Sequence, residues 1–294
     1  MSVLVAAAQY GIGAPADFAT FASRLGERVA NAAAAGARIV VLPEYVALEA
    51  AAGLPAEVRA DFVRSLASLQ TFHDDYVALA RDLATRHAIY LVAGSFLIDI
   101  GGRYRNRSYF ASPEGRLAFQ DKLTLTGFER AAAVIEAGDM LKVFDTAFGR
   151  VAINVCYDVE FPLYAHAQAE AGARLLLVPS CTDTDAGASR VRIGCQARAL
   201  ENQVFVACAV TAGAAPWSPA LDLNTGRAAI YSPVDRGFPS DGVVARVEAS
   251  AEWAFADLDF AALDAFKREG QVANAGDWHA QQRPLIAHAR VEVL

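Results

Sequence analysis

Apolar runs and helical periodicities alternate along the first part of the chain and predict β-α-β units. Residues 2–8 form an apolar run typical of a buried strand, and residues 17–35 carry apolar side chains at helical spacing. Residues 38–42 are a β-branched run that stops at Pro43-Glu44, so the order predicts two parallel strands with a right-handed crossover. The same alternation predicts helices over 74–87, 161–172 and 189–202, and strands over 89–95, 150–155, 174–179 and 204–210.

Two turn signals indicate that other strands pair through hairpins. Gly101 and Gly102 form the glycine pair expected between hairpin strands, and Ser112-Pro113-Glu114-Gly115 is a second turn. The pattern therefore predicts an α/β protein with a mixed sheet. No linker or fixed-period repeat divides it, so we expect one domain over residues 1–265. The less regular residues 266–294 are expected to form a C-terminal extension that packs on the body or on a partner subunit.

Composition and charge narrow the class of protein. Of 294 residues, 54% are hydrophobic, which argues against disorder, and the net charge of −7 comes without a basic run, which argues against nucleic-acid binding. No long uncharged apolar window predicts a membrane span, and the apolar run 1–9 lacks the basic residues of a signal peptide. The four cysteines have neither Cys-x-x-Cys nor metal-ligand spacing. We therefore expect a cytoplasmic protein without a bound metal.

Candidate chemistry lies in three segments. Glu44 follows an apolar strand, at the kind of strand end where α/β sheets place ligands. Lys122 lies in an apolar and hydroxyl-rich stretch that also holds Glu129, and Cys156 follows the strand 150–155. Each residue also has an ordinary interpretation. Glu44 could be a helix cap, Lys122 an edge-strand lysine, Glu129 a surface charge and Cys156 a small buried side chain.

The position of Cys156 is the strongest of these signals. A strand runs directly into this cysteine and a helix is predicted after it, so backbone N–H groups and the positive end of a helix dipole lie near the sulfur. Both features stabilise a thiolate and a developing oxyanion. Cys195 and Cys208 lie in apolar stretches of a predicted helix and a predicted strand, and both are expected to be packed side chains. Cys181 follows another strand end, where it either lines a pocket or packs as a small residue.

Taken together, the three segments resemble the nitrilase, or carbon–nitrogen hydrolase, superfamily. The resemblance implies a Glu-Lys-Cys triad of Glu44, Lys122 and Cys156, with Glu129 as the family's second glutamate. Residues 197–202 are similar to the family's Arg-Ala-x-Glu-Asn helix, and the resemblance extends to about residue 260. It further implies a four-layer α-β-β-α sandwich with two mixed β-sheets, and a homodimer or larger homo-oligomer.

Two positions depart from the pattern of that family. Many relatives have Pro-Thr before the second glutamate, where this chain has Leu125-Thr126, and many have glutamate where it has Leu163. These positions affect loop shape more than the triad. They leave the substrate subclass open.

A mechanism follows from the residue types. None of the five histidines lies in a strand-end motif, so a Cys-His pair is disfavoured and Glu44 is the natural general base. The Lys122 ammonium and the Tyr157 backbone N–H would hold the oxyanion, while Glu129 would orient Lys122 or the substrate. No cofactor is required, because a thioester on Cys156 divides one difficult step into two easier ones.

The substrate is left open among small carbon–nitrogen compounds. The tripeptide Cys156-Tyr157-Asp158 looks like the amidase branches, so a linear amide is the first expectation, with an N-carbamoyl compound or a nitrile as alternatives. The same triad could transfer an acyl group, whereas a non-enzymatic binding module would not need it. Three helix arginines could bind a substrate carboxylate or could form a solvated or salt-bridged face, namely Arg190, Arg192 and Arg198.

Overall fold

The computed structural model describes residues 2–248, 251–284 and 287–293. One mixed sheet has the strand order β5-β4-β3-β2-β1, with β13 on the other side of β1. Its strands are β1 (Ser2–Gly11), β2 (Ile39–Leu42), β3 (Tyr90–Asp99), β4 (Tyr104–Ala111), β5 (Leu117–Asp121) and β13 (Trp253–Asp259). β1, β2 and β3 pair in parallel, whereas β3, β4 and β5 pair antiparallel.

A second mixed sheet follows the order β9-β8-β7-β6, and its β9 also pairs with the end of β1. Its strands are β6 (Val143–Thr146), β7 (Gly149–Ile153), β8 (Leu175–Ser180), β9 (Phe205–Ala214), β10 (Leu223–Asn224), β11 (Ala229–Tyr231) and β12 (Val243–Arg246). β7, β8 and β9 are parallel, and β11 adds antiparallel to β9. The mixed pairing that the turns predicted is therefore confirmed.

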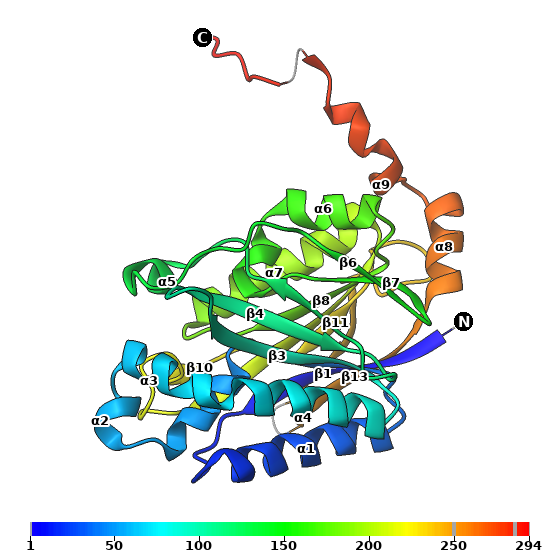
Figure 1. Cartoon of the computed structure of the whole chain (residues 1–294). Helices are drawn as coiled ribbons and strands as arrows, with labels where there is room; N and C mark the ends of the chain where they lie inside the picture. Colours follow the sequence, from blue (N-terminus) through cyan, green and yellow to red (C-terminus); the bar gives the residue numbers. More distant parts are fainter. Residues whose placement is uncertain (1, 249–250, 285–286, 294) are drawn as a thin grey trace.

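Helices cover the outer faces of both sheets (Figure 1). α1 (Phe18–Ala34) and α4 (His73–Arg86) lie along the first sheet, and α6 (Pro162–Glu170) and α7 (Asp185–Asn202) lie along the second. Every residue of β2 and β8 is buried, as expected for central parallel strands that are covered on both faces. The expected four-layer α-β-β-α sandwich is confirmed.

Local sequence explains the best-predicted helix. The Asp17 carboxylate caps α1 by accepting the Thr20 N–H at 2.7 Å, which satisfies one of the N–H groups at the start of the helix. Apolar side chains then recur at helical spacing and face the sheet: Phe21, Leu25, Val29 and Ala32.

A helical stretch that the sequence did not predict follows β2. It contains η1 (Val46–Gly53), α2 (Ala56–Arg59), α3 (Phe62–Leu69) and η2 (Gln70–Phe72). Its alanine-rich start and short segments weaken any periodicity.

Two further short helices lie near the ends of strands. Between β5 and β6 the short helix α5 (Gly127–Ala131) begins at a capping box of Thr126 and Glu129, and η3 (Cys156–Glu160) follows β7.

The C-terminal segment leaves the sandwich along α6. Residue 265, the predicted domain end, lies within α8 (Phe260–Glu269), and α9 (Asn274–Asp277) and η4 (Trp278–Gln281) follow. The Trp278 ring stacks on His166 with centroids 3.9 Å apart, and the His279 Nε2 lies 2.9 Å from the Glu170 carboxylate. Beyond η4 the chain leads away from the body (Figure 1). The domain division and a contact with a partner subunit stay predictions.

Across the described ranges, no helix combines the length and the apolar character needed to cross a lipid bilayer.

Candidate active site

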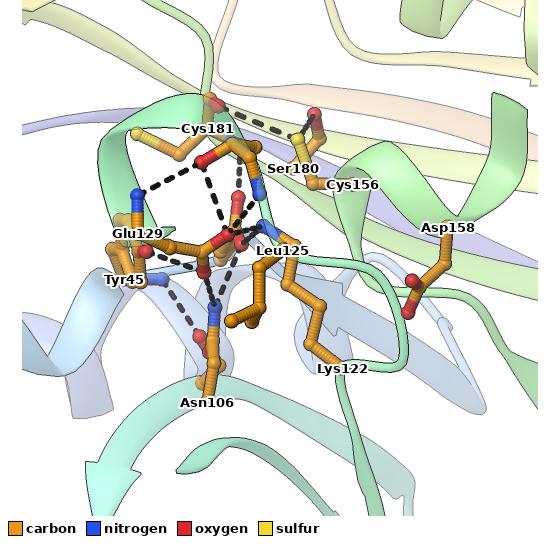
Figure 2. Close-up of polar contacts among 12 residues, drawn as sticks. Tyr45, Asn106, Lys122, Leu125, Glu129, Cys156, Asp158, Ser180 and Cys181 are labelled. Carbon is orange, nitrogen blue, oxygen red and sulfur yellow. Dashed lines mark hydrogen bonds and ion pairs between the residues drawn. The ribbon is translucent and has the colours of Figure 1, made fainter. Parts of the chain in front are cut away.

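Residues from both sheets meet around a hollow of about 240 Å³. Glu44 comes from the end of β2, Lys122 from the end of β5 and Cys156 from the start of η3, after β7. All three line the hollow together with Tyr157 and Cys181. Strands that are distant along the chain thus end beside the same hollow, and Figure 2 shows the side chains of Lys122, Cys156 and Cys181 close together there.

The Glu44 carboxylate is buried and receives three hydrogen bonds. Its Oε1 accepts from the Lys122 Nζ and the Asn106 Nδ2, each at 2.8 Å. Its Oε2 accepts from the backbone N–H of Cys181 at 3.1 Å, which ties β2 to the end of β8. These donors fix the direction of a carboxylate that borders the hollow.

Lys122 is an ammonium group held between two carboxylates. Its Nζ lies 2.8 Å from Glu44 Oε1 and 2.8 Å from Glu129 Oε2, and its side chain is buried. Glu129 is itself fixed, because its Oε1 accepts from the Tyr45 hydroxyl at 2.8 Å and its Oε2 from the Thr126 N–H at 2.8 Å. Glu129 therefore contacts the lysine directly.

Cys156 has a constrained backbone. Its φ is 49°, in the left-handed region that a side chain with a Cβ rarely adopts. The Ser180 hydroxyl donates to its Sγ at 3.3 Å, and the Sγ contacts the Cys181 carbonyl oxygen at 3.4 Å (Figure 2). The sharp turn from β7 into η3 thus presents the sulfur to the hollow beside the first N–H groups of η3, which a helix leaves unpaired internally.

Burial and charge set the protonation of these groups. Burial raises the pKa of the Glu44 carboxyl, and the positive charge of Lys122 only partly offsets this rise. Burial acts to lower the pKa of Lys122, but the charges of Glu44 and Glu129 outweigh it and hold that pKa well above its usual value. Burial acts to raise the pKa of Glu129, yet Lys122 brings it below the usual value. Lys122 and Glu129 are therefore an ion pair.

The Cys156 thiol is neutral at rest. Burial and the negative charge of Glu44 raise the pKa of this thiol well above its usual value, while the charge of Lys122 opposes the rise. The Cys156 thiol in turn acts to lower the pKa of Glu44, although burial remains the stronger influence there. Proton transfer from sulfur to Glu44 must then accompany any nucleophilic attack.

Tyr157 and Cys181 border the hollow in different ways. The Tyr157 ring packs edge-on against Phe161, with centroids 4.9 Å apart, and its backbone follows the sulfur. The Cys181 Sγ contacts the Asn224 Oδ1 at 3.4 Å. Burial raises the pKa of the Cys181 thiol to about 12, so this second thiol is protonated at neutral pH.

The three arginines of α7 are not equivalent. Arg190 lines the hollow and lies 3.7 Å from the Glu160 carboxylate. Arg198 is buried and committed to Glu201 at 3.0 Å and to the Val159 carbonyl oxygen at 3.1 Å, so it is structural. Arg192 borders a different hollow.

Sequence reasoning missed several polar partners. Asn106 donates to both Glu44 and Glu129, Tyr45 to Glu129 and Ser180 to Cys156. A signal for Asn106 existed, because it occupies an inward position in the alternating strand β4. The sequence predicted no role for Asp158. Its carboxylate accepts the backbone N–H groups of the two residues that follow Lys122, and it lies apart from the contacts drawn in Figure 2.

Metal ligation has no evident place in this arrangement. In the part of the chain that the structure describes, no three His, Cys, Asp or Glu side chains are grouped to hold an ion. Lys122 instead supplies the positive charge between the two glutamates.

Comparison with known proteins shows that the chain is similar to carbon–nitrogen hydrolases. The sequence model described as "Carbon-nitrogen hydrolase" matches residues 4–260. "Probable hydrolase YhcX" of Bacillus subtilis is 31% identical over 276 residues, which are 94% of this chain and 53% of that protein, so the chain spans about half of its length. "Omega-amidase NIT2" of Danio rerio is 26% identical over 239 residues, 79% of each chain.

A solved structure has the same fold. A mutant of the amidase from Nesterenkonia sp. AN1, with the acetamide moiety of fluoroacetamide added covalently at its active-site cysteine, superposes with a TM-score of 0.70. The match covers 95% of each chain at 22% identity. The structural similarity therefore includes both sheets and the helices that cover them.

Proposed function

The chain belongs to the carbon–nitrogen hydrolase family, and we propose that it hydrolyses a small non-peptide amide through a thioester on Cys156. The observation that carries the proposal is the meeting of Cys156, Glu44 and Lys122 at one hollow. A volume of about 240 Å³ suits a small substrate better than a peptide. The amidase activities named for NIT2 and for the Nesterenkonia enzyme support amide as the substrate class.

The first half of the reaction forms the thioester. The Cys156 sulfur attacks the amide carbonyl carbon while its proton passes to Glu44, whose raised pKa suits it to accept a proton near neutral pH. The carbonyl oxygen becomes an oxyanion, which the Lys122 ammonium and the Tyr157 backbone N–H stabilise. The oxyanion then collapses, the carbon–nitrogen bond breaks, and Glu44 returns its proton to the leaving nitrogen.

The second half releases the acid. Glu44 takes a proton from water, the oxygen attacks the thioester carbon, and the same two donors stabilise the new oxyanion. The carbon–sulfur bond breaks and the sulfur regains its proton from Glu44. Glu129 keeps Lys122 charged and in place throughout, because the two groups form an ion pair at 2.8 Å.

The proposal is tested by ammonia release from amides, ureido acids and nitriles, with intact-mass detection of an acyl adduct. We expect amides to react fastest, and Cys156→Ala to lower the rate by a factor on the order of 10⁶, the loss typical of a covalent nucleophile. Cys195→Ala is the matched control, since this buried thiol lies outside the hollow. Full activity in Cys156→Ala would exclude the mechanism, and dominant transfer to an added amine would favour the acyl-transferase alternative.

We also propose that the chain forms a homodimer or larger homo-oligomer through the layer of α6 and α7. Large apolar side chains are exposed there, with Leu163 68% and Ile193 57% exposed. Such residues on an outer face are typical of interaction surfaces. Light scattering after size exclusion is expected to give a multiple of the monomer mass, and Ile193→Glu is expected to reduce it. A monomer mass for the wild type at micromolar concentration would contradict this assembly.

A further inference from the structure

A second hollow, of about 440 Å³, lies beside the candidate active site and plays no part in the proposed reaction. Its inner surface includes the buried side chains of Ser180, Cys208 and Tyr231. α7 forms one wall, and the segment before β11, the end of β11 and the end of β12 form another. Thr182 and Val191 line both hollows and therefore form part of the wall between them.

Three arginines surround this second hollow. Arg192 comes from α7, Arg227 precedes β11 and Arg246 ends β12. All three line the hollow together with the buried Tyr231, whose pKa is raised by burial and acted on in the opposite direction by the charges of Arg192 and Arg246. Three segments distant in sequence thus bring like charges to one cavity.

These arginines lack the carboxylate partners of their neighbours. Elsewhere on α7, Arg190 and Arg198 pair with Glu160 and Glu201. Within the described ranges, no carboxylate lies within 4 Å of the guanidinium groups of Arg192, Arg227 or Arg246, and Arg192 donates instead to the neutral Gln196 side-chain oxygen at 3.1 Å.

Acidic residues do little to offset this charge. Asp185 is the acid among the described residues that line the hollow, and it accepts from the Thr225 hydroxyl at 3.0 Å. Glu248 continues the hairpin beyond Arg246 but is not part of the lining. Like charges around a common space repel, and an anion in that space would relieve the repulsion. The excess of positive charge matches a ligand with two negative charges.

The remaining lining suits an oxyanion. Guanidinium groups bind phosphate and carboxylate oxygens through paired hydrogen bonds, and hydroxyls add neutral donors. Ser189 and Tyr231 supply such hydroxyls, whereas the Thr182 hydroxyl already donates to the Thr225 carbonyl oxygen at 2.7 Å. We propose that the second hollow binds a small organic dianion, a phosphate monoester or a dicarboxylate, through Arg192, Arg227 and Arg246.

The test is calorimetric titration of the full-length protein with glycerol 2-phosphate and with succinate, and with uncharged glycerol as the blank. We expect one of the two dianions to bind with a dissociation constant below about 1 mM, and the stronger probe identifies the ligand chemistry. Replacing all three arginines by glutamine is expected to weaken binding at least 10-fold. Arg86→Gln is the matched control, because this exposed arginine of α4 lines neither hollow.

Two controls separate this site from the candidate active site and from misfolding. Ser180 borders the second hollow and donates to the Cys156 sulfur, so the two sites are close. Protein alkylated at Cys156 should still bind the dianion, and loss of binding there would overturn the proposal. If the triple variant does not fold, Arg227→Gln alone is expected to weaken binding several-fold. No binding to the wild type up to 10 mM, or equal binding by the arginine variants, would also overturn it.

Discussion

Glu49 and Glu44 are buried glutamates from the same stretch of chain, and their surroundings differ. The Glu49 carboxylate accepts the Tyr10 hydroxyl and the Gly13 N–H, the latter at 2.7 Å, and lies 3.4 Å from Arg24. It borders neither the candidate active site nor the arginine-lined hollow. Glu49 therefore joins β1, the loop after it and η1.

Glu44 is equally buried and equally supplied with donors, but it borders a hollow and faces a thiol. Lys122 and Cys156 both influence its pKa. The comparison teaches that a buried, paired carboxylate is by itself no sign of catalysis. Access for a small molecule and a neighbouring nucleophile distinguish Glu44 from Glu49.

The largest contrast is expected from Glu44→Gln. A glutamine cannot take the proton from sulfur, so we expect kcat to fall by roughly 10²- to 10⁴-fold, as for other general bases. Ammonia release under saturating amide measures this change. The stability of the variant, from urea unfolding, serves as the control, and an unchanged kcat would remove the distinction between the two glutamates.

Lys122→Gln is expected to affect both activity and stability. Loss of one oxyanion donor lowers kcat by roughly 10²- to 10³-fold. It also leaves Glu44 and Glu129 buried without their counter-ion, and breaking such a pair costs about 3–5 kcal/mol of unfolding free energy. Steady-state kinetics and urea unfolding measure the two effects. A variant that loses stability but keeps kcat would show that Lys122 acts only as a structural ion.

Glu49→Gln is expected to lower stability without changing the chemistry. An amide oxygen can replace one carboxylate oxygen, but the amide nitrogen would then face a donor, which costs about 1–3 kcal/mol. Thermal and urea unfolding measure this loss, while kcat is expected to stay within a few-fold of wild type. A kcat that falls as far as in Glu44→Gln would contradict the purely structural role of Glu49.

The last expected effect is a pH dependence of stability from Asp158. Burial raises the pKa of this carboxyl to about 7 from its usual 3.8, against the N–H groups of Leu123 and Thr124, which lower it. The folded state therefore binds this proton more tightly than the unfolded state. The resulting stabilisation is complete below about pH 4 and is lost as the pH rises through 7.

Asp158→Asn removes this titration. The stability of wild type relative to the variant should decline from pH 4 to pH 7, by at most about 1.4 kcal/mol per pH unit, and level off above. Unfolding temperatures of both proteins across this range provide the measurement. Parallel curves would show that folding does not raise the pKa of Asp158.

Much of the fold could be predicted because its signals are local. Helix α1 combines a cap at Asp17 with apolar residues at one helical spacing, and β2 is an uninterrupted apolar run. The stretch from η1 to η2 was missed, because alanine suits core and surface alike and short helices carry few periods. Its position is fixed instead by distant contacts such as that between Tyr10 and Glu49.

The sequence by itself determined the alternation of strands and helices along much of the chain, the residue types at three strand ends and the thiol at a strand-to-helix turn. Only the tertiary structure decided which side chains complete the site. Asn106 of β4 reaches Glu44 past the one strand, β3, that separates β4 from β2, and the Cys181 N–H reaches it from the other sheet. The three-arginine hollow also has no local signature. Such contacts depend on strand register and on how the sheets pack, which join residues far apart in the chain, whereas sequence periodicity reports only on near neighbours.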